Sequence, residues 1–220
     1  GVARRKNNCH FTIYDIFGRE CLKGSCSFWS ELPKNIDDYV VCKYTGNSPD
    51  CYGYVVSGLS VSPAGIRSAD YYDHYYFLQD GLFPSSSSYQ YVSAKGYAEK
   101  SSVAKSFHTG QVRCELVDDG IMYETLYYDH QGRLCQSHSN THLGTYEHRY
   151  YSYNFLGQPL SVRTSFDGGR NYVHTFSYDH VGRKLSDDLS FDDAPPINLM
   201  RYGYDDLGRM YAKYRMNGAL

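Results

Sequence analysis

The residues Phe176-Ser-Tyr-Asp-His-Val-Gly-Arg183 decide the fold, because the same pattern recurs along the chain. Three further segments align with it without gaps: Leu126-Tyr-Tyr-Asp-His-Gln-Gly-Arg133, Tyr151-Ser-Tyr-Asn-Phe-Leu-Gly-Gln158 and Tyr202-Gly-Tyr-Asp-Asp-Leu-Gly-Arg209. Their Asp or Asn residues stand at positions 129, 154, 179 and 205, in steps of 25, 25 and 26. A fifth copy, Ile13-Tyr-Asp-Ile-Phe-Gly-Arg19, stands alone near the start. Recurrence at a fixed period predicts a repeat architecture.

Each copy of the motif predicts a β-hairpin. The Asp or Asn occupies the first position of a four-residue turn and accepts hydrogen bonds from backbone amides ahead of it. The Gly three residues later supplies the positive φ that closes a type I turn with a bulge. The predicted turn residues are Asp15, Gly18, Asp129, Gly132, Asn154, Gly157, Asp179, Gly182, Asp205 and Gly208.

The hairpins are expected to pair with one another. The aromatic-x-Tyr alternation before each turn places two rings on one face of a strand. One hairpin cannot bury such a face alone, so neighbouring units must join edge to edge. The predicted fold class is mainly β, with consecutive antiparallel hairpin repeats forming a curved, extended sheet.

Composition supports an all-β chain and argues against binding to nucleic acid. The 220 residues include 25 Tyr and 10 Phe but 1 Trp, and tyrosine favours strands. Net charge is −2, whereas phosphate binding needs clustered Lys and Arg. The one basic run is Arg4-Arg5-Lys6, and no apolar stretch approaches the roughly 18 residues of a membrane span. We therefore expect neither a nucleic-acid partner nor a membrane span.

The motif copies divide the chain into three predicted regions. Residues 1–25 form an isolated hairpin of the repeat type. Residues 26–118 form a divergent β-rich region, which an insertion would explain, and residues 119–220 form the tandem repeats. Within the middle region, Ala94–Lys105 is compatible with a short helix, although Gly96 disfavours it. The chain begins with Gly1 rather than Met, which suggests either a tag scar or a cut from a longer protein.

The seven cysteines do not predict a metal site. They show no CxxC pair, and zinc sites use such pairs or Cys and His at short spacing. A disulfide between Cys21 and Cys26, or between Cys42 and Cys51, is conceivable. Free thiols that pack as small hydrophobic side chains are the favoured reading.

Candidate catalytic groups have simpler structural roles. An Asp that recurs in every repeat caps a turn, whereas a catalytic pair is used once. The adjacent pairs Asp37-Asp38, Asp118-Asp119, Asp187-Asp188 and Asp192-Asp193 would point to opposite faces of a strand. His138 and His142 lie too far apart on a strand to share one ion. The sequence has no Gly-x-Ser-x-Gly elbow and no phosphate-binding loop, so we expect no enzyme activity, no metal and no cofactor.

The Tyr-Asp-x-x-Gly-Arg hairpins at this spacing resemble the RHS/YD-repeat family of large secreted and surface proteins. The resemblance is specific over residues 126–210 and Ile13–Arg19, and the middle region resembles the stretch that precedes the repeats in Bacteroides-type members. It implies a ribbon of hairpins that forms a hollow shell, which in bacterial members encloses a C-terminal toxin. One copy departs from the pattern, since Gln158 replaces the usual Arg; if that Arg pairs with the next repeat, this unit lacks the pairing.

The leading expectation is therefore a non-catalytic scaffold segment of a secreted or cell-surface bacterial protein. Its partners would be flanking repeats of the same polypeptide and an enclosed C-terminal domain. The alternative is a carbohydrate- or cell-surface-binding module with tyrosine-rich faces. The aromatic side chains expected to face such a ligand are Tyr127, Tyr151, Phe176 and Tyr202.

Overall fold

The computed structural model describes residues 9–26, 41–47, 49–58, 61–104, 106–114, 120–192 and 194–215. The basic run Arg4–Lys6, the pairs Asp37-Asp38 and Asp118-Asp119, and Asp193 lie outside these ranges. The side chains of Cys9 and Cys26 are also outside the description.

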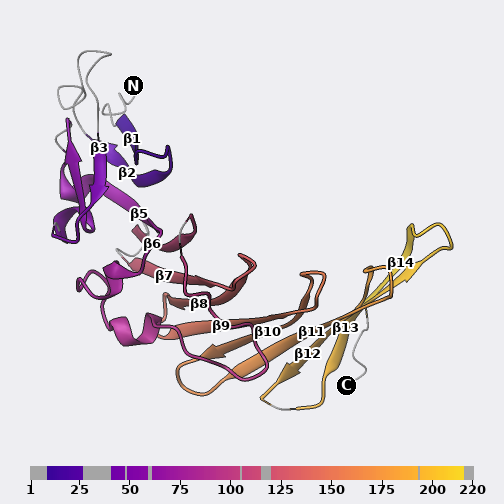
Figure 1. Ribbon diagram of the computed structural model, residues 1–220. Helices are drawn as coiled ribbons and strands as arrows, with labels where there is room; N and C mark the ends of the chain where they lie inside the picture. The colour runs from indigo at the N-terminus through magenta and orange to yellow at the C-terminus, as the bar shows by residue number, and fades with distance from the viewer. Residues whose placement is uncertain are drawn as a thin grey trace, which may run out of the picture. The chain divides into compact units, whose positions relative to one another are not determined.

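The predicted mainly-β fold class is confirmed, because strands dominate the described residues (Figure 1). Twelve strands form one antiparallel sheet in the order β1-β2-β5-β6-β7-β8-β9-β10-β11-β12-β13-β14, and β3 pairs with β4 in a second sheet. In the described ranges the helices are short 3₁₀ turns, and none of them has the length and hydropathy of a transmembrane segment. The strands are β1 (Cys9–Tyr14), β2 (Glu20–Cys26), β3 (Val41–Tyr44), β4 (Tyr54–Ser57), β5 (Ile66–Tyr72), β6 (His108–Cys114), β7 (Ile121–Tyr128), β8 (Leu134–Asn140), β9 (Tyr146–Tyr153), β10 (Pro159–Phe166), β11 (Asn171–Tyr178), β12 (Lys184–Phe191), β13 (Ile197–Tyr204) and β14 (Met210–Arg215).

The chain divides into two compact units whose limits differ from the predicted regions. The first unit contains residues 1–90 and 104–125, and the second contains residues 91–103 and 126–220. The hairpin β1–β2 belongs to the first unit, where β2 pairs with β5 (Leu22 opposite Ala69), so it is joined to the divergent region. The predicted division places β2 and β5 in separate regions. Strands that pair across more than 40 residues of sequence leave no local pattern by which the pairing could be predicted.

The first unit has an aromatic core. Tyr71 on β5 is fully buried, and its ring stacks on Phe77 of η4 (Tyr76–Leu78) with centroids 4.4 Å apart. Phe83 contacts both of these rings and also Tyr89, in η5 (Ser86–Tyr89). The 3₁₀ turns after β5 therefore fold back to cover one face of this strand.

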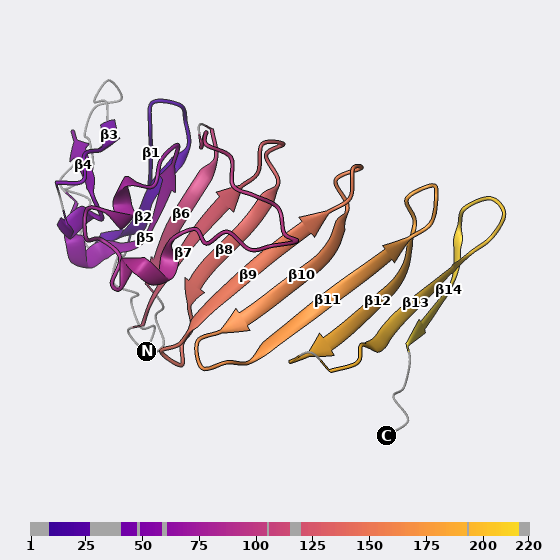
Figure 2. The same cartoon turned by 60° about the horizontal axis from the view of Figure 1, so that its bottom comes forward.

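The second unit is a row of hairpins in which each strand pairs with the next in sequence (Figure 2). Val162, for example, lies opposite Tyr151 on one side and His174 on the other, and several pairs contain a register shift, as between Ser177 and Tyr178. The side chains on the two faces of this sheet are only partly covered, and most positions of β9 to β13 are half-buried.

The helix considered for Ala94–Lys105 is wrong, since the described residues of this segment are irregular and extended. Residues 91–103 lie across the first strands of the second unit (Figure 2). Gln136 on β8 bonds both the amide and the carbonyl of Val92, and the amide of Ala98 bonds the carbonyl of Tyr151. Hydrogen bonds to the sheet replace the internal bonds that a helix would make, and Gly96 adopts φ +87°.

Candidate functional site

The repeat turns share one hydrogen-bond pattern. In the copy at Asp129, Oδ1 accepts from the amides of Gln131 and Arg133, both at 2.9 Å, and Oδ2 accepts from Arg133 Nε at 2.7 Å. The Gly132 amide donates to the carbonyl of Asp129 at 3.0 Å, with Gly132 at φ +78°. Burial raises the pKa of Asp129, but the hydrogen bonds from Arg133 and Gln131 outweigh burial, so the pKa lies below its usual value. The carboxylate is thus fully engaged in holding the turn.

The other copies repeat this geometry residue by residue. Asp15, Asp179 and Asp205 each accept from two turn amides and from the Arg four residues later. Asn154 keeps the two amide bonds, and its Nδ2 donates to Gln158 Oε1 at 2.8 Å. The glycines Gly18, Gly132, Gly157, Gly182 and Gly208 all have φ between +75° and +88°.

Gly182→Val is expected to lower the free energy of unfolding by more than about 1 kcal/mol, because a β-branched residue is strained at φ +88°. An added Cβ would also meet Gln158 Nε2 at 3.1 Å. The measurement is chemical unfolding, with Thr175→Val at an exposed position of β11 as the control. Equal stability of Gly182→Val and the original protein would contradict the assigned turn.

A second set of contacts joins each turn to the next repeat. The guanidinium of Arg133 lies 4.5 Å from the ring centroid of Tyr153, and the Tyr153 hydroxyl donates to the carbonyl of Leu134 at 2.6 Å. Arg183 and Tyr204 repeat this pair at 4.8 Å, with the Tyr204 hydroxyl bonded to Lys184. We call this arrangement of Arg over the next Tyr the repeat clamp. It places one Arg and one Tyr at the junctions that follow the Asp129 and Asp179 turns.

Gln158 preserves a bond across its junction despite losing the charge. Its Nε2 donates to the carbonyl of Gly182 at 2.6 Å, and the Tyr178 hydroxyl donates to the carbonyl of Pro159 at 2.9 Å. The expectation that this unit lacks cross-repeat pairing is therefore wrong, because the Gln158 amide donates to a backbone carbonyl of the next turn.

The first unit contains a copy of the motif that the sequence period does not reveal. Tyr72 is the last residue of β5, and Asp73 follows it. The Tyr72 hydroxyl donates to the carbonyl of Glu20 at 3.0 Å, as the hydroxyls of the clamp tyrosines donate to their carbonyls. The guanidinium of Arg19 lies 4.4 Å from the Tyr72 ring centroid. The Asp73 amide donates to the carbonyl of Phe107, and Asp73 Oδ1 accepts from the Ser106 amide. Residues 74–107 thus replace the usual tight turn of this repeat.

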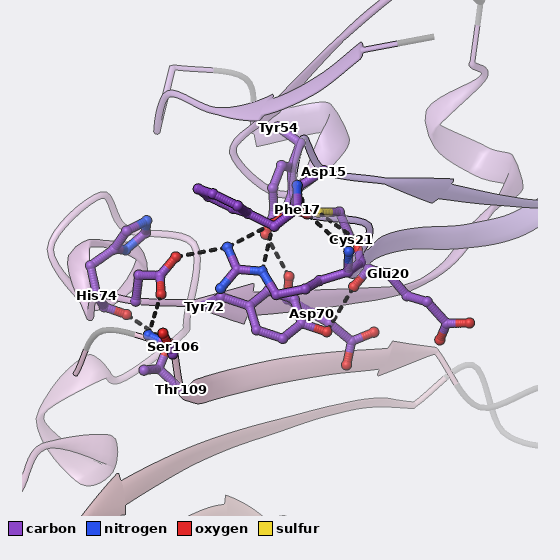
Figure 3. Close-up of polar contacts among 12 residues, drawn as sticks. Asp15, Phe17, Glu20, Cys21, Tyr54, Asp70, Tyr72, His74, Ser106 and Thr109 are labelled. Atoms are coloured by element: carbon purple, nitrogen blue, oxygen red, sulfur yellow. Dashed lines mark hydrogen bonds and ion pairs between the residues drawn. The ribbon is translucent and has the colours of Figure 1, made fainter.

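A cavity of about 350 Å³ opens beside this junction. Side chains from the β1–β2 turn, β3, β4 and the end of β5 line it, including Phe17, Arg19, Cys21, Cys42, Tyr44 and His74. Figure 3 shows Asp15, Cys21 and Tyr54 close together, with Tyr72 and His74 on neighbouring segments. The lining surface is mostly apolar, so the cavity suits a small, largely apolar molecule.

Arg19 is paired with two carboxylates beside the cavity. Arg19 Nη2 donates to Asp73 Oδ2 at 2.7 Å, and Arg19 Nε donates to Asp15 Oδ2 at 2.7 Å. The bond to Asp73 raises the pKa of Arg19 further, and Arg19 lowers the pKa of Asp73. Burial lowers the pKa of His74. Two carboxylates on one guanidinium leave no free positive charge for an anionic ligand at this position.

The four aromatic residues expected to face a ligand do not share one environment. Tyr127 is 2% exposed, and its ring contacts His138 and Tyr91 on the face covered by residues 91–103. Tyr151, Phe176 and Tyr202 are half-buried on the opposite face. Lys184 Nζ lies 4.1 Å from the Phe176 ring centroid and 5.7 Å from that of Tyr202. Tyr127 is thus misplaced in this set, because one residue of register changes the face.

The five cysteines whose side chains are described are free thiols, namely Cys21, Cys42, Cys51, Cys114 and Cys135. The conceivable disulfides Cys21–Cys26 and Cys42–Cys51 are therefore wrong for this structure. Within the described ranges no three His, Cys, Asp or Glu side chains gather where they would hold a metal ion.

A buried histidine chain lies beneath residues 91–103. His138 Nε2 lies 3.1 Å from Gln136 Oε1, and His138 Nδ1 lies 2.8 Å from His148 Nδ1. His148 Nε2 lies 3.2 Å from Asp167 Oδ1. Burial, and then the neighbouring His148, lower the pKa of His138 to about 3.

The stability of the second unit is expected to fall between pH 6.5 and about 3. Above pH 6.5, His138 is neutral in both states; below it, the unfolded chain takes up a proton that the native chain refuses until about pH 3. The loss amounts to about 2 kcal/mol between pH 7 and pH 5. Urea unfolding at both pH values measures this loss of stability. We expect His138→Gln to remove the loss and the control His142→Gln, at an exposed turn position, to retain it. The same pH dependence in His138→Gln would contradict the assignment.

Comparisons with known proteins give structural likeness alone. No protein-family model matches the chain, and no curated protein matches it. The solved structure "Crystal Structure of TcdB2-TccC3" is similar at 14% identity and a TM-score of 0.28, over 94% of this chain and 12% of that chain. "Crystal Structure of TcdB2-TccC3-Cdc42" is similar at 15% identity and a TM-score of 0.28, over 94% and 11%. The chain therefore spans about one eighth or less of the length of these solved chains, and the fold assignment depends on the strand pairing above. That long antiparallel sheet of consecutive hairpins is consistent with the RHS/YD-repeat resemblance of the sequence.

Proposed function

We propose that this chain is a non-catalytic scaffold segment of a secreted or surface-displayed bacterial protein of the RHS type. In this role the hairpins form part of a β-shell, and their partners are flanking repeats of the same polypeptide and an enclosed C-terminal domain. The proposal extends the sequence resemblance to the whole protein.

The observation that carries the proposal is the repeated use of the same side chains for structure. Each motif carboxylate or amide is engaged by its own turn, as at Asp129, and the clamps at Arg133 and Arg183 hold the following repeat. A group that is used identically in every unit contributes to architecture rather than to one reaction. This supports a scaffold and leaves no motif residue poised as an acid, base or nucleophile.

Limited proteolysis of the complete polypeptide that carries this chain tests the enclosing role. We expect the C-terminal domain to resist cleavage while the repeats are folded and to be cut at least tenfold faster in Gly182→Val, which weakens a repeat turn. Thr175→Val is the control and should retain the protection. Equal cleavage of the C-terminal domain in the native polypeptide and in the isolated domain would overturn the proposal.

Glycan binding separates the scaffold from the carbohydrate-binding alternative. Isothermal titration and a glycan array should show no saturable binding to the chain. Saturable binding that is lost in Tyr151→Ala or Tyr202→Ala, but kept in a control change at the opposite face such as Thr175→Val, would refute a purely structural role.

A further inference from the structure

Two thiols that lie 21 residues apart in sequence meet at the cavity of the first unit. Cys21 is on β2 of the large sheet, and Cys42 is on β3, which pairs with β4 in the separate two-stranded sheet. Their exposed fractions are 1% and 2%, and both line the same cavity. Cys21 Sγ lies 3.6 Å from the carbonyl oxygen of Arg19.

The remaining described cysteines have other surroundings. Cys114 Sγ lies 3.2 Å from the Tyr52 hydroxyl, Cys135 is buried in the second unit, and Cys51 is half-buried after β3. Cys21 and Cys42 are therefore distinguished as two buried thiols that line the same cavity. Two buried thiols that line one cavity are candidates for a disulfide, which requires Cα atoms within about 7 Å of each other.

We propose that Cys21 and Cys42 form a reversible disulfide that fastens the β3–β4 hairpin to β2 under oxidising conditions. The proposal does not depend on the scaffold function. The oxidant is a low-molecular-weight disulfide, small enough for the cavity of about 350 Å³.

The reaction is two successive thiol–disulfide exchanges. The Cys21 thiolate attacks one sulfur of the small disulfide, so that its S–S bond breaks, a mixed disulfide forms on Cys21 and one thiolate leaves. The Cys42 thiolate then attacks the Cys21 sulfur, which forms the Cys21–Cys42 bond and releases the second thiolate. The two protons of the cysteine thiols end on the two released thiols, and two electrons pass from the cysteines to the oxidant.

Local electrostatics support this order of attack. The hydrogen bond with Cys42 lowers the pKa of Cys21, and the same bond, together with burial, raises the pKa of Cys42. The thiolate is the attacking form, so Cys21 reacts first.

The test uses the purified chain, reduced and then exposed to 2-hydroxyethyl disulfide as the probe. Remaining thiols are alkylated, and the digested protein is analysed by mass spectrometry for linked peptides. We expect one cross-link, between Cys21 and Cys42, and a melting temperature about 10 °C higher than that of the reduced chain, since the bond closes a loop of about 20 residues. A reducing phosphine should reverse both changes.

Two variants separate the proposed pair from general thiol reactivity. Cys51→Ser should retain the cross-link and the shift in melting temperature. Cys42→Ser should lose both and leave Cys21 as the mixed disulfide with the probe. Full alkylation of Cys21 and Cys42 after oxidation of the original protein, or a cross-link of either to another cysteine, would overturn the proposal.

Discussion

Asp129→Ala is expected to destabilise the second unit by about 3 kcal/mol. The Asp129 side chain is 2% exposed and accepts from two backbone amides as well as from Arg133. Alanine leaves both amides without their acceptor and the largely covered guanidinium of Arg133 without its ion pair. Urea unfolding followed by circular dichroism measures the loss.

The copy at Asp205 provides the control for this prediction. Asp205 makes the same bonds, but its side chain and that of Arg209 are much more exposed, so water replaces the lost partner. Asp205→Ala should therefore cost clearly less than Asp129→Ala. Equal costs at both positions would show that burial of the turn is not the source of its stability.

Tyr71→Ala is expected to cost about 3–5 kcal/mol in the first unit, the range for removal of a large buried aromatic side chain. The Tyr71 ring is fully buried and contacts four aromatic rings, including stacked Phe77 and Tyr54. Its hydroxyl donates to the carbonyl of Tyr52 at 3.0 Å. The same unfolding measurement applies, with near-ultraviolet circular dichroism as a readout of the aromatic core.

Two further substitutions separate the ring from the hydroxyl. Tyr71→Phe keeps the ring and should cost about 1 kcal/mol, the value of one hydrogen bond. Tyr76→Ala removes an exposed ring on the adjacent 3₁₀ turn and should have a small effect. If Tyr71→Ala were as mild as Tyr76→Ala, the aromatic core would not organise this unit.

The tandem hairpins could be predicted from sequence because their determinants are local. An Asp or Asn and a Gly three residues apart fix each turn, and the strands on either side follow from the alternation of side chains. In this way Asp179 and Gly182 predict the hairpin of β11 and β12, which the structure contains. Local hydrogen bonds leave a readable pattern.

The copy at Tyr72-Asp73 could not be found by its period, because residues 74–107 separate Asp73 from the strand that returns. The residues Tyr71-Tyr-Asp-His74 carried a signal, since the Tyr-Asp pair matches the motif. This copy lacks the Gly of the motif. Instead, the inserted segment binds Asp73 through the amide of Ser106 and the carbonyl of Phe107.

Nonlocal contacts explain the other differences. Cys21 meets Cys42 because β3 packs beside the first hairpin, whereas sequence proximity favoured Cys26 and Cys51 as partners. Residues 94–104 bind the sheet instead of forming a helix. The sequence pattern groups Tyr127 with aromatic residues of the opposite sheet face, because a shift of one residue along a strand moves a side chain from one face to the other.

A double-mutant cycle on Arg133 and Tyr153 tests most directly whether clamps join consecutive repeats. Arg133→Gln, Tyr153→Leu and the double variant are unfolded in urea, so that the contacts of each residue with its own turn cancel. The contact at 4.5 Å predicts a coupling free energy of about 1 kcal/mol between the two residues. Strict additivity of the two substitutions would contradict the clamp and, with it, the account of this chain as a scaffold of mutually locked hairpins.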